Sequence, residues 1–237
     1  MLESRQLVPE RMDDPALPPQ EHDRALADLA RLNSLARSAA ILWPTVRSQL
    51  RRAAAQRRVA TVMDVATGSG DIPVALDRMA RAERLPVRWI GIDASAHALA
   101  RARDRALHAG TSIELHQADA VQALPVRADV VISSLFLHHL TETQAIAALR
   151  TMRGAAARAL AVSDLRRSGP GLALAWTASR VLSRSPVVHF DAVASVRGAF
   201  SERELAGLAR EAGLEGASIR RAWPQRMVLH WSRGATS

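Results

Sequence analysis

The most informative part of the sequence is Thr61-Val62-Met63-Asp64-Val65-Ala66-Thr67-Gly68-Ser69-Gly70-Asp71. Its first half is apolar, as in a buried β-strand, and it runs into a turn that contains two glycines. Gly68 and Gly70 permit positive φ and remove the Cβ atoms that would keep a ligand away from the backbone. The helix expected over residues 72–82 points its unpaired amides and its dipole into the same space. A nucleotide-like ligand is therefore the first hypothesis.

Two classes of ligand use such a turn, and the neighbouring residues separate them. A dinucleotide fingerprint requires a third small residue for close packing of helix on strand, and Pro73 stands at that position. Asp64 precedes the loop, where a carboxylate is poorly placed beside a pyrophosphate but can accept hydrogen bonds from an ammonium group or an ordered water. The turn therefore favours a cationic ligand without phosphate, such as S-adenosylmethionine.

The order Asp-Val-Ala-Thr-Gly-Ser-Gly-Asp over residues 64–71 resembles motif I of class I S-adenosylmethionine-dependent methyltransferases. The resemblance implies that Asp64, Ala66, Gly68 and Gly70 lie at the cofactor. Ala66 stands where that family commonly has its first glycine, a departure that costs little if φ is negative there. The implied α/β fold is Rossmann-like: a mainly parallel seven-stranded sheet with helices on both faces and an antiparallel last strand.

Two further strands are expected to end in carboxylates. Residues 87–93 form a buried strand that ends in Asp93, about 20 residues beyond the glycine loop, where an acid reaches ribose hydroxyls. Asp93 is followed by Ala94, which we place at the cofactor too. The alternative, that Asp93 caps the helix expected over residues 96–108, is weakened because Ser95 can serve as the cap.

The next two strands complete the predicted cofactor site. After a short strand at residues 112–116, the resemblance places Asp119 and Ala120 against the adenine. The fourth strand, residues 128–135, contributes Ser133.

The segment after that fourth strand contains the main candidates for acid–base catalysis. Phe136-Leu137-His138-His139-Leu140 follows it, and a fifth strand over residues 159–165 contains Asp164. If these strands are neighbours, the histidines and Asp164 meet at the carboxyl edge, where open α/β sheets bind ligands. His139 with Asp164 resembles the base and acid pair of some small-molecule O-methyltransferases, and His138 is the competing candidate. Alternatively, both histidines only pack the strand end.

Residues 166–200 are too long for a simple connection and read as a lid over the methyl acceptor. Trp176 supplies an apolar wall, and His189, Asp191 and Arg197 are available to orient polar groups. A contact between two copies of the chain explains the apolar residues equally well. A helix capped by Ser201 follows, and residues 217–223 and 227–231 read as the closing antiparallel hairpin.

The whole chain sets the outer limits. Its 237 residues suffice for one α/β domain, over residues 58–237, preceded by a surface lead-in and cap helices over residues 1–57. Residues 21–40 are expected to be helical, with Trp43-Pro44 separating them from a second helix that reaches residue 56. There are no cysteines, and we predict no metal site. We expect a cytoplasmic protein with no membrane span.

The net charge of +9 does not indicate a nucleic-acid partner. The cations are all arginines, dispersed over predicted helix surfaces, and no aromatic platform for stacking bases is evident. We expect a small-molecule substrate instead.

Together, these patterns resemble bacterial methyltransferases of the ubiquinone and menaquinone biosynthesis group and those that tailor phenolic or polyketide metabolites. The resemblance implies methyl transfer to a hydroxyl of a small, mostly apolar molecule. Two alternatives stay open: C-methylation of a related aromatic or quinone precursor, and a non-catalytic partner subunit that binds S-adenosylmethionine.

Overall fold

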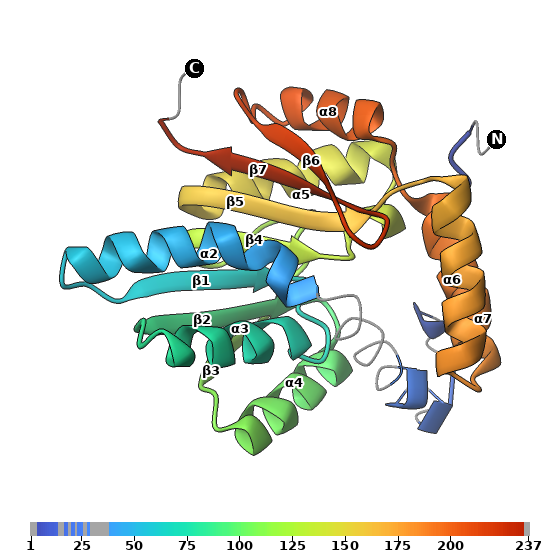
Figure 1. Cartoon of the computed structure of the whole chain (residues 1–237), viewed down its shortest axis with the longest axis horizontal. Helices are drawn as coiled ribbons and strands as arrows, with labels where there is room; N and C mark the ends of the chain where they lie inside the picture. The colour runs from blue at the N-terminus through green and yellow to red at the C-terminus, as the bar shows by residue number, and fades with distance from the viewer. Residues whose placement is uncertain are drawn as a thin grey trace.

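The computed structural model describes residues 4–13, 17, 18, 20, 21, 23–25, 28 and 38–234. Its centre is one seven-stranded sheet in the order β3-β2-β1-β4-β5-β7-β6 (Figure 1). The strands are β1 (Ala60–Val65), β2 (Val87–Asp93), β3 (Ile113–Gln117), β4 (Ala128–Ser134), β5 (Ala156–Leu165), β6 (Ser218–Ala222) and β7 (Arg226–Ser232). Strands β1 to β5 pair in parallel, and β7 is antiparallel to both β5 and β6. The predicted sheet is confirmed.

Helices cover both faces of this sheet. The helices are α2 (Ser38–Ala55), α3 (Asp71–Ala82), α4 (Ala96–Ala109), α5 (Glu142–Ala155), α6 (Gly169–Leu182), α7 (Pro186–Gly198) and α8 (Glu202–Glu211), with short 3-10 turns η1 (Arg11–Asp13) and η2 (Leu137–His139). Because strand side chains alternate, Val62 packs with α2 and α3, whereas Met63 and Val65 pack with α5 and α8. The two buried layers fix the strand register.

The helix ends largely follow the expected signals. Ser95 accepts a hydrogen bond from the Ala98 amide, as predicted for the cap of α4. Thr141 and Ser201 each form a capping box at the start of α5 and α8. A Cβ on Gly70, whose φ is +72°, would lie 3.1 Å from the Cβ of Ala102 on α4. Gly70 is thus required both by its φ and by the close approach of α4.

Pro44 does not separate two helices, contrary to the sequence expectation. It lies inside α2, which is continuous from residue 38 to residue 55. Leu42, Val46 and Leu50 on this helix are fully buried against the sheet, and that packing outweighs the lost backbone donor of proline. The helix expected over residues 21–40 lies mostly outside the described residues.

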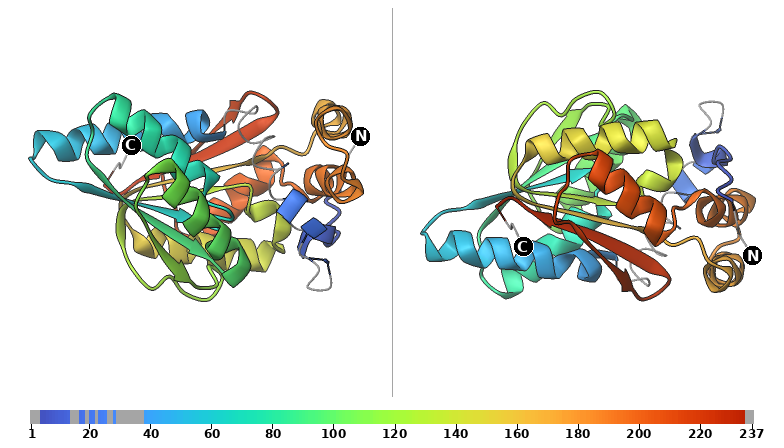
Figure 2. Two further views of the ribbon diagram at one scale, coloured as in Figure 1. Left: turned by 90° about the horizontal axis from the view of Figure 1, so that it is seen from below. Right: turned by 90° about the horizontal axis from the view of Figure 1, so that it is seen from above.

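The segment between β5 and α8 is a pair of helices, α6 and α7, which stand beyond the carboxyl ends of the parallel strands (Figure 2). The N-terminal residues lie against them. The carboxylate of Asp191 on α7 accepts hydrogen bonds from the amides of Arg11 and Met12, at 2.8 and 3.1 Å. The Gln6 amide donates to the Arg197 carbonyl at 3.0 Å. Residues 6–12 of the expected surface lead-in are thus bound to α7.

No helix in the described ranges has both the length and the apolar character needed to cross a membrane.

Candidate functional site

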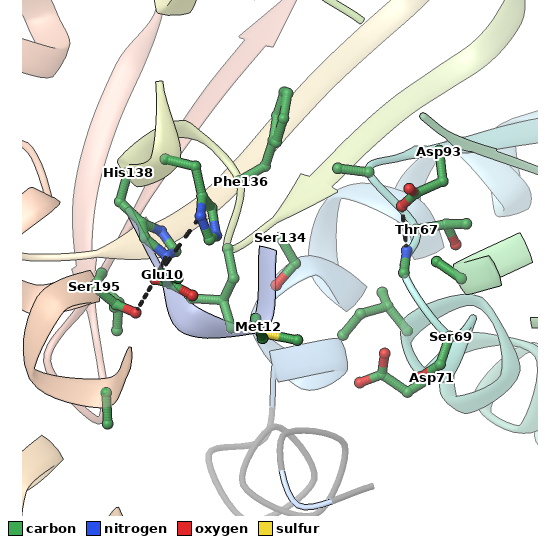
Figure 3. Close-up of a pocket in the computed structure, with 18 of the residues that line it drawn as sticks. Glu10, Met12, Thr67, Ser69, Asp71, Asp93, Ser134, Phe136, His138 and Ser195 are labelled. Atoms are coloured by element: carbon green, nitrogen blue, oxygen red, sulfur yellow. Dashed lines mark hydrogen bonds and ion pairs between the residues drawn. The ribbon is translucent and has the colours of Figure 1, made fainter. Parts of the chain in front are cut away.

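A cavity of about 1010 Å³ opens at the carboxyl edge of the sheet (Figure 3). One end is formed by the glycine turn after β1 and the tips of β2 and β3. The other end is formed by the turn after β4, by α6 and α7, and by the N-terminal segment. The residues that line the cavity include Glu10, Asp64, Ala66, Gly68, Asp71, Asp93, Ala94, Asp119, Ala120, Ser134, His138, His139, Ser195 and Arg226.

The glycine turn is tied to the tip of β2. The Gly68 amide donates to one Asp93 carboxylate oxygen at 2.8 Å, and the Ser95 amide donates to the other at 2.9 Å (Figure 3). Each carboxylate oxygen has a second lone pair, so Asp93 can still accept from ribose hydroxyls. A Cβ on Gly68, at φ +55°, would meet nothing within 4 Å and would project into space that a ligand can use. The predicted places of Gly68 and Asp93 fit a nucleoside.

Asp64 is the buried carboxyl group at this end of the cavity. It is 1% exposed, one of its oxygens accepts the Thr67 hydroxyl at 2.8 Å, and Oδ1 has no hydrogen-bond partner among the described residues. Burial, reinforced by Asp71 and Asp93, raises the pKa of Asp64 to about 8 despite the bond from Thr67. A positively charged ligand would relieve this cost. The ammonium and sulfonium groups of S-adenosylmethionine therefore fit the donor set that the chain presents.

At Ala66 the condition of negative φ is not met, and the expected place of Ser133 was wrong. Ala66 has φ of +56°, so the alanine at the family's usual glycine position is in the left-handed region and is strained. Ser133 does not line the cavity: its hydroxyl is fully buried and donates to the Val65 carbonyl at 2.9 Å, joining β4 to β1. Because side chains alternate, the next residue, Ser134, lines the cavity, and its buried Oγ has no partner among the described residues.

The tips of β2 and β3 place the remaining predicted cofactor residues along the same end. Ala94, Asp119 and Ala120 line the cavity. The Asp119 carboxylate accepts the Val121 amide at 2.8 Å and the Gln122 side-chain amide at 3.0 Å, which fixes its orientation. Contact with adenine stays a prediction for Asp119.

His138, and not His139, makes the predicted pair with Asp164. His138 Nδ1 lies 2.6 Å from Asp164 Oδ1, and the His138 amide donates to Oδ2 at 3.2 Å. The 3-10 turn η2 explains the choice, since it points the first histidine at the end of β5 and leaves the second toward the cavity. His139 stacks on His138 with ring centroids 4.2 Å apart, and 27% of its side chain is exposed.

Glu10 faces this pair from the N-terminal segment (Figure 3). Its Oε1 lies 3.6 Å from His138 Nε2 and 3.8 Å from His139 Nδ1, and it accepts the Ser195 hydroxyl of α7. Burial favours neutral forms, but Asp164 and Glu10 outweigh it and raise the pKa of His138 to about 9. The same interactions hold the pKa values of Asp164 and Glu10 below their usual range, although burial opposes this.

Backbone contacts hold the histidine turn in place. The Arg5 guanidinium donates to the His138 carbonyl at 3.0 Å and to the Leu140 carbonyl, and it lies 3.8 Å from the centre of the Phe200 ring. A Cβ on Gly198, at the end of α7, would come within 2.9 Å of the His138 carbonyl oxygen. Chain segments distant in sequence therefore close around His138.

The four residues predicted to bind the acceptor do not line the cavity. His189 binds the Ser183 carbonyl at 2.8 Å, Asp191 holds the N-terminal segment, Arg197 is exposed, and Trp176 is 52% exposed with a guanidinium over its ring. Residues 186–198 are helical, so only one side of α7 can face inward. The inward side chains of α6 and α7 are Leu174, Ala175, Ala178, Ser179, Leu182, Ala192, Ser195 and Val196.

Three contributors were missed by sequence reasoning. Glu10 lies among prolines with no periodic pattern. Arg226, at the start of a strand, looks like one of many surface arginines. Ser134 follows Ser133, and the strand period could have distinguished them had the facing of β4 been fixed first. No local signal identifies the other two.

Glu10, His138 and His139 each offer one atom of a kind that binds metals, all within 4.8 Å of one another. The sequence prediction of no metal stays a prediction. The contact of one His138 nitrogen with Asp164 and the positive charge on the ring both oppose metal binding, because a metal-binding imidazole must be neutral.

Residues 62–159 match the family described as a methyltransferase domain. No functionally curated protein matches the chain. Among solved structures, a Nostoc punctiforme protein provisionally described as an O-methyltransferase aligns with a TM-score of 0.61 and 18% identity, over 92% of this chain and 63% of that one. The S-adenosylmethionine-dependent methyltransferase SibL aligns with a TM-score of 0.64 and 19% identity, over 96% of this chain and 63% of SibL.

A third similar structure is the Synechocystis magnesium protoporphyrin IX methyltransferase with bound S-adenosylhomocysteine. It aligns with a TM-score of 0.56 and 17% identity, over 94% of this chain and 91% of that one. The chain spans less than two thirds of the Nostoc protein and of SibL. At these identities the structures establish the fold, and the predicted class I methyltransferase fold is confirmed.

Proposed function

We propose that this chain, whose residues 62–159 match a methyltransferase domain, transfers a methyl group from S-adenosyl-L-methionine to a hydroxyl of a small, mostly apolar phenolic or polyketide-type metabolite. One observation carries the proposal. A single cavity joins the glycine turn at Gly68 to the buried pair of His138 and Asp164. Methyl donor and proton acceptor would therefore share one chamber.

The chain's own residues explain how the donor would be held. Asp93 would accept the ribose hydroxyls, and the backbone at Gly68 allows close approach. Asp64 would take the ammonium group with an oxygen that lacks a partner in the described part of the chain. When bound, the cofactor supplies an electrophilic methyl carbon.

His138 is the proposed base. As the hydroxyl oxygen of the acceptor forms its bond to the methyl carbon, its proton would pass to His138 Nε2, while Asp164 holds Nδ1–H and stabilises the resulting charge. A base with a pKa of about 9 is well matched to a phenol, whose own pKa is about 10, as for tyrosine. His139, with a more exposed ring, would contact the acceptor rather than remove its proton.

The acceptor class follows from the lining of the far end. Leu174, Ala175, Leu182 and Val196 are apolar and come from the two helices that close the chamber. We propose that α6 and α7 act as the lid predicted for residues 166–200. Pockets of this kind bury most of the surface of a small ligand. The exposed Trp176 leaves open the second reading, a contact between two copies of the chain.

The test is turnover with isotope-labelled cofactor and a panel of phenols, resorcinols and hydroxypyrones, with mass analysis of the products. His138→Ala should lower kcat by about 10²- to 10⁴-fold, the usual contribution of a positioned base. His139→Ala should raise KM more than it lowers kcat. If both histidines can be changed together without loss of turnover, while cofactor binding persists, acid–base catalysis here is wrong.

Two alternatives have separate readouts. C-methylation would use the same base to generate an electron-rich phenolate, and the product would carry the label on a ring carbon rather than as an ether. A non-catalytic partner subunit would bind S-adenosylhomocysteine but turn over none of the acceptors. A cytoplasmic location stays a prediction.

A further inference from the structure

Arg226 is a buried cation in the cavity that the proposed chemistry does not use. It is the first residue of β7, pairs in register with Leu165 of β5 and Ala222 of β6, and is 5% exposed. It lines the cavity, and its Nη1 has no hydrogen-bond partner within the residues that the structure describes. A buried guanidinium nitrogen without a hydrogen-bond partner costs free energy of folding, and a bound acceptor would remove that cost.

The nearby carboxylates do not satisfy this cation by direct contact. Asp164 and Asp71 act on Arg226 through space, raising its pKa, but burial outweighs them and lowers it to about 10. Asp164 is already bound to His138 and to the Leu165 amide. Asp164 belongs to the histidine pair and Asp71 is the first residue of α3, so Arg226 lies near both of these carboxylates.

The sheet register shows what else faces the same way. Ile132 of β4 pairs with Asp64 of β1 and with Ala161 of β5. Further along β5, on the same face as Ala161, Leu165 pairs with Arg226 of β7. Side chains of paired residues lie on one face and recur every second residue. Asp64 and Arg226 therefore belong to the face covered by α2 and α3, near the same strand edge.

Ser134 lies on this face as well, two residues after Ile132. Asp64, Ser134 and Arg226 all line the cavity. One buried polar atom of each, Asp64 Oδ1, Ser134 Oγ and Arg226 Nη1, lacks a partner among the described residues. A buried carboxyl group at one end of this row, a hydroxyl between and a cation at the other end match a zwitterion, whose ammonium group would favour the ionised form of Asp64.

We propose that Arg226 is the recognition site for a carboxylate inside the cavity. This inference rests on the proposed function. The guanidinium fork pairs with a carboxylate through two parallel hydrogen bonds, which fixes both position and orientation. Such a carboxylate can come from the methionine tail of the cofactor, with Asp64 taking the ammonium group, or from an acidic acceptor.

The first arm of the test measures cofactor binding by calorimetry. S-adenosylhomocysteine and 5′-methylthioadenosine differ by the amino-acid tail. Arg226→Met should weaken binding of S-adenosylhomocysteine by on the order of 10- to 100-fold, the value of a charged hydrogen-bonded contact, and leave 5′-methylthioadenosine unchanged. Arg226→Lys should show a smaller loss. Arg203→Met, at an exposed position on α8, is the matched control and should bind both ligands as the wild type does.

A measurement on the unaltered protein covers the case in which the variants do not fold. Decarboxylated S-adenosylhomocysteine keeps the ammonium group but lacks the carboxylate, so the wild type should bind it at least tenfold more weakly. Thermal melting of Arg226→Met should show no loss of stability, since the change removes a buried charge.

The second arm addresses the acceptor. With S-adenosylhomocysteine present, 2-hydroxybenzoate and 2-hydroxybenzyl alcohol serve as probes with and without a carboxylate. Selective loss of 2-hydroxybenzoate binding in Arg226→Met, with cofactor binding intact, assigns the site to the acceptor. The proposal is overturned if the wild type binds the decarboxylated analogue as well as S-adenosylhomocysteine and folded Arg226→Met changes neither probe. Failure of the wild type to bind S-adenosylhomocysteine at all would instead refute the proposed function and this inference with it.

Discussion

His138 Nδ1 lies 2.6 Å from an oxygen of Asp164, and both side chains are almost fully buried. This contact joins the turn after β4 to the end of β5 and directs the second ring nitrogen of His138 toward Glu10. Together, the two carboxylates stabilise the protonated ring, with consequences for the pH dependence of activity.

The pH profile should report His138. The base must be neutral to accept a proton, and its pKa is raised to about 9, so kcat/KM should rise about tenfold per pH unit below pH 9 and level off above it. Asp164→Asn removes one of the charges that raise this pKa and should move the rise to lower pH while reducing the plateau. A profile of the wild type that is already flat at pH 7 would contradict the role.

Glu10→Gln should also move the profile to lower pH. Glu10 Oε1 lies 3.6 Å from His138 Nε2, and its charge contributes to the raised pKa of His138. The measurement is kcat/KM against pH for the variant and for Glu215→Gln, an exposed control in the connection between α8 and β6. An unchanged profile in Glu10→Gln would show that Glu10 does not reach the reacting histidine in solution.

Asp64→Asn should raise the thermal stability of the protein at pH 8 and weaken its binding of S-adenosylhomocysteine. The folded-state pKa of Asp64 is about 8, above the ordinary value near 4, so the folded protein binds a proton more readily than the unfolded chain and its stability falls as pH rises from about 4 to about 8. The asparagine variant should lose this dependence and melt at higher temperature at pH 8. It should also bind S-adenosylhomocysteine more weakly. Asp104→Asn, exposed on α4, should do neither.

Ala66→Gly should stabilise the protein. Ala66 has φ of +56°, where alanine is strained by roughly 1 kcal/mol and glycine is not. We expect the free energy of unfolding in urea to rise by about that amount. Ala206→Gly, in the exposed part of helix α8, should instead lower it by about 1 kcal/mol. Equal losses in both variants would refute the strain at Ala66.

Removal of metal ions should leave activity unchanged. Glu10, His138 and His139 are close enough to bind a cation, but His138 carries a proton at neutral pH and its Nδ1 is bound to Asp164. Dialysis against a chelator, followed by metal analysis and assay, checks this. Activity lost on chelation and restored by one divalent ion would assign a metal to the cluster.

Most of the fold could be predicted from local signals in the sequence. The glycine turn, the strands and the helix starts were predicted from Gly68 and Gly70, from Asp93 at a strand end and from a serine before two helices. Each of these signals depends on neighbours in sequence. Pro44 was misjudged because the burial of α2 against the sheet, a tertiary effect, outweighed its local preference.

The site was predicted only in part. The expected contact between a histidine and Asp164 is observed, because parallel strands bring their carboxyl ends together. Which histidine makes the contact depends on the η2 turn. Glu10 reaches the site from more than 120 residues away in sequence, held by the contacts of Asp191 and Ser195 on α7. Residues 186–198 were not expected to form a helix, so the inward side chains of α7 were misassigned.

The most direct test uses S-adenosylmethionine carrying a ¹³C-labelled methyl group, the wild-type protein and a panel of phenolic acceptors, with carbon NMR of the product. We predict an aryl methyl ether as the labelled product, and its loss in His138→Ala protein that still binds S-adenosylhomocysteine. A label on a ring carbon, or turnover that survives the loss of His138, would contradict it.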